Sequence, residues 1–281
     1  MRSLHDPVEP DGLITEDVGA WAEQKYRLLA LYASLVSTGM KNRWKRLVYI
    51  DLFSGSGYAH IRETARIVRA SPILALSVQD KFTDYVFCDA NEQLISALET
   101  RATKGFAECR CSFFCGDANA LVDEVLARVP VGSRTESVLS FCFLDPFKLS
   151  ALKFATIERL ATRRMDFLVL VPIGMDAKRN LHNYTEDDNR TLDEFMGTDT
   201  WREEWPTASQ DGVGLDPFLM GVFASQMKRL GYIAPGITDT AFVKSDRNLP
   251  LYRLAFFSKH DMGSKFWREA RKYSDDQMTL F

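Results

Sequence analysis

Cysteine and histidine are scarce in this sequence, with five and four residues among 281. An odd number of cysteines in a chain of this length suits a reducing compartment, so we expect a cytoplasmic protein. No apolar run approaches the roughly 20 residues of a membrane span, and the N-terminus lacks the basic and apolar regions of a signal peptide. We therefore expect no membrane partner.

Three of the cysteines, Cys109, Cys111 and Cys115, lie within the segment CRCSFFC. Zinc and iron–sulfur sites usually use C-x-x-C pairs and a fourth ligand, and neither the cysteines nor the histidines show such spacing. On an extended strand the three side chains would share one face, as packing residues do. We expect no metal, and the spacing leaves open whether these cysteines have another role.

The chain also lacks a strong net charge, which is −3 with a pI of about 5.9. This argues against a protein that is basic throughout and coats nucleic acid, although a local basic patch can still contact phosphate. Apolar residues make up 46% and charged residues 26%, so the chain can form a sizeable core without a disulfide or a metal.

The pattern along the chain predicts a single domain with an arm at its start. Residues 1–12 carry two prolines and several acids, which favours a loose arm. The domain then covers 13–281. Apolar spacing predicts a helix over 13–39, capped by Thr15 or Asp17, before a basic turn that ends at residue 46. A helical insertion over residues 176–235 precedes two closing strands and a last helix.

Strand-like and helix-like segments alternate in the first two thirds of the chain. The strand-like segments are nearly continuous apolar runs: RLVYID, DYVFCDA, CSFFCGDA, SVLSFCFLDPF and MDFLVLVPIG. Such runs are expected when helices cover both faces of a sheet. The alternation predicts an α/β fold with a doubly wound, mostly parallel sheet.

The first of these strands runs into the loop of LVYIDLFSGSGYAH, residues 47–60. Ligands of open α/β sheets bind beyond the carboxyl ends of the strands, and this strand ends there at Asp51. Ser54, Gly55 and Gly57 allow the backbone to approach a ligand closely. A tight turn without a ligand is the alternative, because Gly-x-Gly without a third glycine is a weak signal.

Three more carboxylates follow strand ends. Asp89, next to Ala90, ends the second strand, and Asp117, next to Ala118, follows the third. Asp145 ends the fourth strand. Parallel strands bring their carboxyl ends to one edge, so these side chains are expected to line one crevice with the glycine loop. Each carboxylate alone has another explanation, as a cap for the helix that follows.

These positions favour an adenosyl group that carries an amino acid. A dinucleotide fingerprint needs a third glycine where His60 stands, and a Walker loop needs Gly-Lys-Ser/Thr, which is absent, so pyrophosphate fits poorly. Asp51 would receive a cationic amino group, Asp89 the two ribose hydroxyls, and Asp117 the adenine amine, with backbone N–H groups nearby. These are the needs of S-adenosyl-L-methionine (SAM).

The same motifs resemble those of class I SAM-dependent methyltransferases, in the order DLFSGSG, Asp89, Gly-Asp117 and Asp145-Pro146-Phe147. The likeness extends over roughly residues 15–270 through WAEQKYRLLALY, SPILAL, VPIGMDAKRN, DEFMGTDTWREEW and YRLAFFSKHDMGSKFW. Over that span the chain resembles the three-Cys-motif partner (TcmP) family. The resemblance implies a bacterial or archaeal protein with a Rossmann-like class I methyltransferase fold, typically encoded beside a radical-SAM-type three-Cys-motif protein.

LDPF stands where amino-group methyltransferases carry Asp/Asn-Pro-Pro-Tyr/Phe. Asp145 and the Pro146 carbonyl would accept hydrogen bonds from an exocyclic amine, while Phe147 stacks on the base. Only one proline is present, and a helix start with a proline turn is the alternative. The tripeptide also resembles that of guanine-N2 tRNA methyltransferases. Carbon-5 cytosine methyltransferases need a Pro-Cys nucleophile, which the sequence lacks.

Two basic segments are candidates for substrate contacts. MDAKRN, after the fifth strand, places Lys178, Arg179 and Asn180 near the same edge, where they would meet a phosphate or an acidic substrate. Solvated loop charges explain them equally well. KNRWKR offers Trp44 as a stacking platform, but this segment precedes the first strand and so lies at the opposite, amino edge.

Two functional hypotheses follow. The first is a SAM-dependent methyltransferase acting on an exocyclic amino group of a nucleic acid base, in DNA or RNA. The second is a non-catalytic, methyltransferase-like partner that docks a radical-SAM-type three-Cys-motif protein. The sequence does not separate DNA, RNA, protein and small molecules as acceptors, and it does not settle the oligomeric state.

Overall fold

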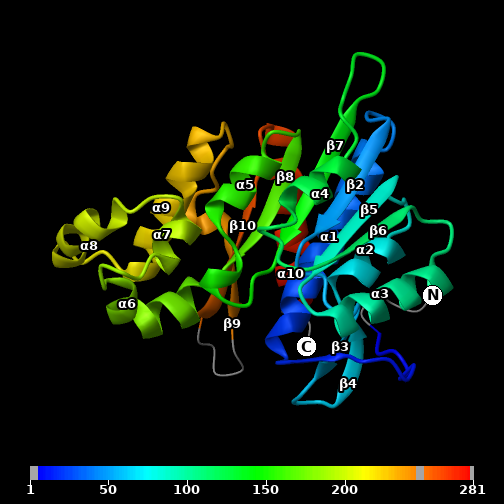
Figure 1. Ribbon diagram of the computed structural model, residues 1–281, viewed down its shortest axis with the longest axis horizontal. Helices are drawn as coiled ribbons and strands as arrows, with labels where there is room; N and C mark the ends of the chain where they lie inside the picture. Colours follow the sequence, from blue (N-terminus) through cyan, green and yellow to red (C-terminus); the bar gives the residue numbers. More distant parts are fainter. Residues whose placement is uncertain (1–5, 245–249, 279–281) are drawn as a thin grey trace.

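A seven-stranded sheet runs through the protein, of which the computed structural model describes residues 6–244 and 250–278 (Figure 1). In spatial order the sheet contains β6 (Cys111–Cys115), β5 (Asp84–Asp89), β2 (Arg46–Asp51), β7 (Val138–Leu144), β8 (Met165–Val171), β10 (Pro250–Phe257) and β9 (Ala241–Lys244). The first five of these strands are parallel, whereas β10 is antiparallel to both of its neighbours.

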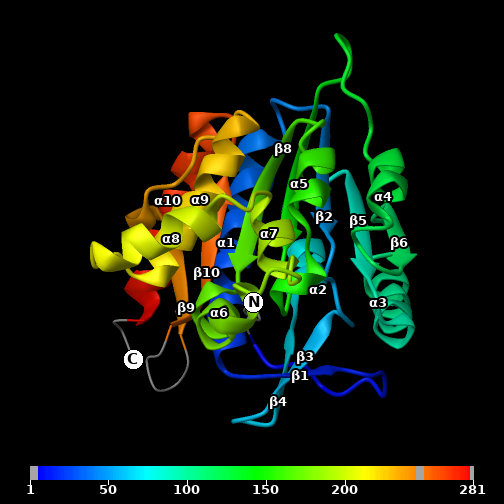
Figure 2. The same ribbon diagram turned by 60° about the vertical axis from the view of Figure 1, so that its left-hand side comes forward.

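Helices cover both faces of the sheet (Figure 2). One layer contains α1 (Trp21–Met40), α2 (Ser71–Ser77), α3 (Glu92–Gly105) and α10 (Asp261–Met278). The other contains α4 (Val122–Arg128), α5 (Phe154–Leu160) and helices from the segment after β8. This arrangement confirms the predicted α/β, Rossmann-like class I methyltransferase fold with a doubly wound, mostly parallel sheet.

Both faces of the central strands are buried because successive side chains point to opposite layers. In β2, Tyr49 packs in the core with α1, whereas Ile50 packs in the core with α4 and α5. Tyr32 of α1 packs on the sheet, with its ring centroid 4.7 Å from those of Phe141 and Phe256. Double burial of this kind requires apolar residues at every position, which explains the continuous apolar runs.

The N-terminal helix is shorter than the sequence predicts. The expectation of a helix over 13–39 is wrong in its first turns, because α1 begins at Trp21, and neither Thr15 nor Asp17 caps it. The segment before it is extended instead and contains a short strand, β1 (Glu16–Val18). The apolar spacing of these residues is therefore overridden by pairing with a distant part of the chain.

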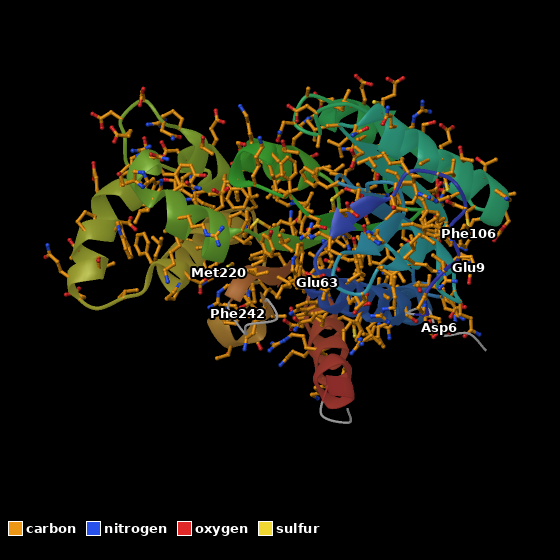
Figure 3. All side chains as sticks on the ribbon, turned by 90° about the horizontal axis from the view of Figure 1, so that it is seen from below. Asp6, Glu9, Glu63, Phe106, Met220 and Phe242 are labelled. Carbon is orange, nitrogen blue, oxygen red and sulfur yellow. The ribbon has the colours of Figure 1, made fainter. Side chains whose placement is uncertain are left out.

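That distant part is a hairpin of β3 (Tyr58–Ile61) and β4 (Arg66–Arg69), which follows the glycine loop. β1 pairs in parallel with β3 to give a separate three-stranded sheet below the carboxyl edge of the main one (Figures 1 and 2). Glu63 in the hairpin turn, labelled in Figure 3, accepts a hydrogen bond from the Ala20 backbone N–H at 2.8 Å. The Glu63 carboxylate thus satisfies a backbone N–H at the start of α1 that has no partner within the helix.

A buried arginine ties the N-terminal segment to the glycine loop. Arg101 of α3 donates to the two carboxylate oxygens of Asp11 at 2.7 and 2.8 Å, and to the Ser56 carbonyl at 2.7 Å. The same guanidinium lies 4.4 Å from the ring centroid of Tyr58. Residues 1–5 of the predicted arm lie outside the described residues, but Asp11, also in that arm, is held in place.

A helical segment separates β8 from β9 and projects from one side of the molecule (Figure 1). It contains α6 (Lys178–Tyr184), α7 (Thr191–Met196), α8 (Trp201–Gln210) and α9 (Leu215–Arg229). Met220, labelled in Figure 3, is buried where α9 meets the rest of the protein. Within the described residues, no helix combines the length and the apolar character needed to cross a membrane.

We expect Arg101→Gln to lower the free energy of unfolding by about 3 kcal/mol, because it leaves the Asp11 carboxylate and several carbonyls without their donor. Urea unfolding measures this loss, and hydrogen exchange should show faster exchange in the segment before β1. Arg66→Gln is the matched control, since Arg66 pairs with Glu23 in an exposed position and should contribute less than about 1 kcal/mol. Equal losses of unfolding free energy in the two variants would contradict a stabilising role of the Arg101 contacts.

Candidate active site

A cleft of about 890 Å³ opens at the carboxyl edge of the main sheet, with β1 and the start of α1 on one side. From β2 the chain proceeds outward through β5 to β6, then returns to β7 on the other side of β2. Open α/β sheets bind ligands at such a reversal. Eight of the predicted site residues line this cleft: Ser54, Asp89, Ala90, Asp117, Ala118, Asp145, Pro146 and Phe147.

The glycine loop is shaped by its contacts with β5. The Gly55 N–H donates to Asp89 Oδ2 at 2.8 Å, and the Ser54 N–H donates to the Cys88 carbonyl at 2.9 Å. Gly55 and Gly57 have φ angles of 58° and 87°, in the left-handed region that favours glycine. A Cβ at Gly57 would also lie 2.8 Å from Ile73. The two glycines shape the loop from behind and do not line the cleft themselves.

Asp89 and Asp117 are held by the backbone of the turns that follow them. Asp89 Oδ1 accepts from the Asn91 N–H at 2.9 Å, and Asp117 Oδ1 accepts from the Asn119 N–H at 2.9 Å. The cap of α3 is the Asn91 side chain rather than Asp89. Both carboxylates therefore have fixed positions and retain lone pairs for a ligand.

Asp51 lies beneath the cleft rather than in its wall. Its side chain is fully buried, and it accepts from the Phe53 N–H at 3.2 Å and from the Tyr49 hydroxyl at 3.3 Å. Burial raises the pKa of Asp51 to about 7, and the charge of Asp145 adds to the shift. The structure thus places Asp51 out of direct contact with anything held in the cleft.

Asp145 forms an ion pair with Lys25 of α1, and both side chains are largely buried. The Lys25 ammonium also lies 5.3 Å from the Trp21 ring centroid and 4.9 Å from that of Tyr26. Phe147, two residues beyond Asp145, is 73% exposed. The Asp-Pro-Phe segment therefore presents a paired carboxylate inside the cleft and an exposed aromatic ring at its mouth, with the Lys148 ammonium 5.3 Å from the ring centroid.

Lys25 is a site residue that the sequence analysis missed. It is 4% exposed and stands in the apolar stripe of α1 with Leu28, Leu29 and Tyr32, where lysine is rarely buried without a partner. A lysine in the apolar stripe of a helix was the sequence feature that could have indicated a buried ion pair.

Glu16 of β1 is the second missed residue. Its Oε2 accepts from the Ser56 N–H at 3.3 Å, and a Cβ added at Gly55 would collide with its carboxylate. Burial, together with the negative charge of Asp89, raises the pKa of Glu16. No local pattern indicates its role, because the segment around Glu16 has the apolar spacing of a helix.

The cleft lining is acidic overall. It contains three cations, Lys25, Arg62 and Lys148. Its five carboxylates are Glu16, Asp17, Asp89, Asp117 and Asp145. An acidic lining attracts a cationic ligand and repels a phosphate.

The predicted substrate contacts Lys178, Arg179 and Asn180 lie on α6 and do not line the cleft. Asn180 Nδ2 instead donates to Asp176 Oδ1 at 2.8 Å. Burial raises the pKa of Tyr252, a lining residue, and the positive charge of Arg179 opposes this shift. The charge of Arg179 therefore acts on a residue that lines the cleft.

The cysteines do not form a cluster. Cys109 and Cys111 pack against the core in the layer that contains α3, as expected, but Cys115 is exposed at the end of β6, so the three do not share one environment. Burial raises the pKa of Cys111 to about 12. Among the described residues, no group of three or more His, Cys, Asp or Glu side chains is arranged to hold a metal ion.

No protein-family model matches the chain, and no curated protein does. Among solved structures, protein LPL1258 from Legionella pneumophila is 8% identical, with a TM-score of 0.49 over 89% of this chain and 91% of that one. An O-methyltransferase from Bacillus cereus in complex with SAH is 10% identical, with a TM-score of 0.49 over 87% and 84%. Magnesium protoporphyrin IX methyltransferase from Synechocystis, with bound SAM, is 10% identical, with a TM-score of 0.42 over 89% and 87%. At these values the activities of those proteins do not transfer to this chain.

We expect Asp51→Asn to reduce the pH dependence of stability. The folded protein keeps the Asp51 proton up to about pH 7, whereas the unfolded chain releases it near 3.8. Stability should therefore fall as pH rises through this window, by up to about 1.4 kcal/mol per pH unit from this group. Asparagine does not ionise, so the variant should lose less stability in urea unfolding over the same range.

Asp123→Asn is the control for this measurement, because Asp123 is exposed on α4 and pairs with Arg159 at the surface. It should leave the slope of stability against pH as in the wild type. If Asp51→Asn also leaves the slope unchanged, Asp51 ionises normally in the folded protein.

Proposed function

We propose that the protein is a methyltransferase that uses SAM as its methyl donor. The observation that best supports this is the row of carboxylates in one cleft: Asp89 after β5, Asp117 after β6 and Asp145 after β7. SAM is cationic at its reactive end, so a cleft whose lining is acidic overall attracts it.

The lining residues fit the parts of this cofactor. Asp89 would accept from the ribose hydroxyls, since its two oxygens each hold one backbone N–H and keep lone pairs. Asp117 and Ala118 would hold the adenine, with Ala90 and Ser54 alongside.

The amino group of the cofactor needs a carboxylate in the wall of the cleft. Asp51 is buried behind that wall, whereas Glu16 lines it beside the glycine loop. We therefore assign the amino group to Glu16 and give Asp51 an indirect role, as a buried carboxyl beneath the loop. Gly55 and Gly57 shape the loop that brings these groups together.

Methyl transfer to nitrogen needs little beyond positioning. SAM, when bound, supplies an electrophilic methyl group whose bond to sulfur breaks with the electron pair left on sulfur. Lys25 holds Asp145 by Oδ2, which leaves Oδ1 to accept from an acceptor amine. The Pro146 carbonyl would accept from the same amine, and the exposed ring of Phe147 would stack on the acceptor. The nitrogen would then release one proton, and Asp145 would accept it.

The acceptor that we propose is an exocyclic amine of a nucleic acid base, in DNA or RNA. A base is neutral, so it can enter an acidic cleft that repels phosphate. Lys178 and Arg179, exposed on α6 outside the cleft, would meet the phosphates.

A non-catalytic partner of a radical-SAM-type three-Cys-motif protein is the second candidate, which the resemblance to the TcmP family implies. The Lys25–Asp145 ion pair favours it, because the carboxylate already has a partner. Such a protein should co-purify with its partner and transfer no labelled methyl group to DNA or RNA.

We expect Asp89→Asn to weaken SAM binding about tenfold or more, because a charged acceptor of the ribose hydroxyls is lost. Isothermal titration calorimetry with SAM and with its demethylated product measures the change. The exposed Asp123→Asn variant carries the same chemical change outside the cleft and should bind SAM as the wild type does. Equal affinity of all three proteins would place the cofactor elsewhere.

Asp145→Ala and Asp145→Asn separate the two candidate functions. The alanine variant should bind SAM within a few-fold of the wild type but transfer no labelled methyl group to DNA or RNA. The asparagine variant keeps an oxygen that accepts from an amine, so it should retain part of the transfer. Normal transfer by the alanine variant would remove Asp145 from the acceptor site, and no transfer by the wild type would favour the non-catalytic partner.

A further inference from the structure

A second cleft, of about 490 Å³, opens at the amino edge of the same sheet. Three loops form it: the turn after α1, the long loop before β7 and the turn between α5 and β8. The loop before β7 extends beyond the upper edge of the sheet in Figure 1. β7 spans seven residues, so about 23 Å separates this cleft from the carboxyl edge. The two clefts are therefore distinct.

The lining of the amino-edge cleft carries positive charges that no acidic side chain in the lining balances. It includes Arg43, Arg163 and Arg164 and contains no aspartate or glutamate. Within the described part of the chain, none of these arginines forms an ion pair with a carboxylate. Arg46, a few residues away, pairs with both Asp84 and Glu136. The arginines of the cleft are thus free to bind an anion.

Two residues of this lining each have a buried polar atom with no hydrogen-bond partner among residues 6–244 and 250–278: Arg163 Nε and Ser140 Oγ. Ser140 stands on β7 and is 0% exposed. A buried donor without an acceptor is unfavourable, and protein structures rarely leave one. Both atoms are closed to solvent, so the remaining N–H groups of the arginines are the donors that an oxyanion in the cleft would meet.

An adjoining cavity of about 600 Å³ shares the residues Arg43, Trp44, Thr162, Arg163 and Arg164 with this cleft. Its remaining lining is mostly apolar: Val36, Met40, Leu139, Met165, Met262 and Phe266 are among the residues that it adds.

Trp44 stands where the two cavities meet. Its ring centroid lies 5.2 Å from the guanidinium carbon of Arg164. The one carboxyl group in the apolar cavity is Asp166, whose pKa burial raises to about 7, so it does not carry a full negative charge near neutral pH. A ligand with a phosphate at one end and a planar group at the other suits these surroundings.

We infer that the two adjoining cavities bind a phosphorylated ligand of the nucleotide class. The phosphate lies among Arg43, Arg163 and Arg164, and the planar base lies in the apolar cavity beside Trp44. Each of the two cavities has a volume within the range of small-ligand sites. The inference does not depend on methyl transfer, because it concerns another edge of the sheet and other residues.

Guanosine 5′-monophosphate is the probe for this site, and isothermal titration calorimetry on the full chain is the measurement. We expect the wild type to bind it more tightly than inorganic phosphate or guanosine alone, because each of these lacks one half of the contacts. Arg163→Gln should weaken binding about tenfold or more, and Arg43→Gln should do the same, since each removes a charged donor. Among the described residues Arg163 Nε has no hydrogen-bond partner, so its substitution should leave the fold intact.

Lys45→Gln is the matched control, because Lys45 is an exposed cation beside Trp44 that does not line either cavity. It should change the affinity by less than about twofold. Failure of the mononucleotide to bind would overturn the inference, as would equal weakening by Lys45→Gln. Binding of a single-stranded oligonucleotide alone, with no binding of the mononucleotide, would also overturn it.

The Asp89→Asn variant separates this site from the cofactor cleft. Its affinity for guanosine 5′-monophosphate should equal that of the wild type, even where SAM binding is lost. If Asp89→Asn instead abolishes mononucleotide binding, the nucleotide occupies the cleft at the carboxyl edge and the inference is wrong. The effect of Asp89→Asn on SAM binding therefore tests the proposed function. The effect of Arg163→Gln on mononucleotide binding tests the inference of a second site.

Discussion

The candidate site depends on the hydrogen-bonded register of the parallel strands. Asp51 of β2 pairs with Phe87 of β5 on one side and Phe143 of β7 on the other, so the three strands end within two residues of each other. The residues that follow these three strand ends must therefore lie together at one edge of the sheet. This constraint, rather than attraction between them, gathers the carboxylates, since like charges in one cleft repel.

The repulsion has to be offset inside the protein, and Lys25 does this. Its ammonium stands against Asp145, while Asp51 lies beneath with a raised pKa. An ion pair that is taken from water stabilises the fold only when its geometry and surroundings are good. Here two aromatic rings flank the ammonium, and the ion pair holds the Asp145 carboxylate in a fixed position in the cleft. A cationic cofactor would complete the balance of charge.

The sheet and its carboxylates are predictable from the sequence because long apolar runs lead directly into the acids, as β5 leads into Asp89. Glu16 and Lys25 are not predictable in the same way. The segment around Glu16 has helical spacing, but its pairing with β3 decides its structure, and no local pattern encodes that pairing. In the sequence, Lys25 is a single charged residue within the apolar stripe of α1. Its role becomes clear only from the fold, which brings α1 against Asp145. Asp51 ends its strand where the sequence predicts, but its side chain is buried beneath the cleft, which the strand-end pattern alone does not encode.

The two edges of the sheet differ in charge for a reason that begins with the helices. Each helix that follows a parallel strand has its positive N-terminus near the carboxyl edge and its negative C-terminus near the amino edge. Arg43 follows the end of α1, and Arg163 follows the end of α5, so the dipoles favour cations there. A dipole provides no acceptor for Arg163 Nε or Ser140 Oγ, and neither atom has a hydrogen-bond partner in the part of the chain that the structure describes. The helices therefore explain why arginines are tolerated at this edge without carboxylates, and these arginines, which form no ion pair among the described residues, favour an anionic ligand.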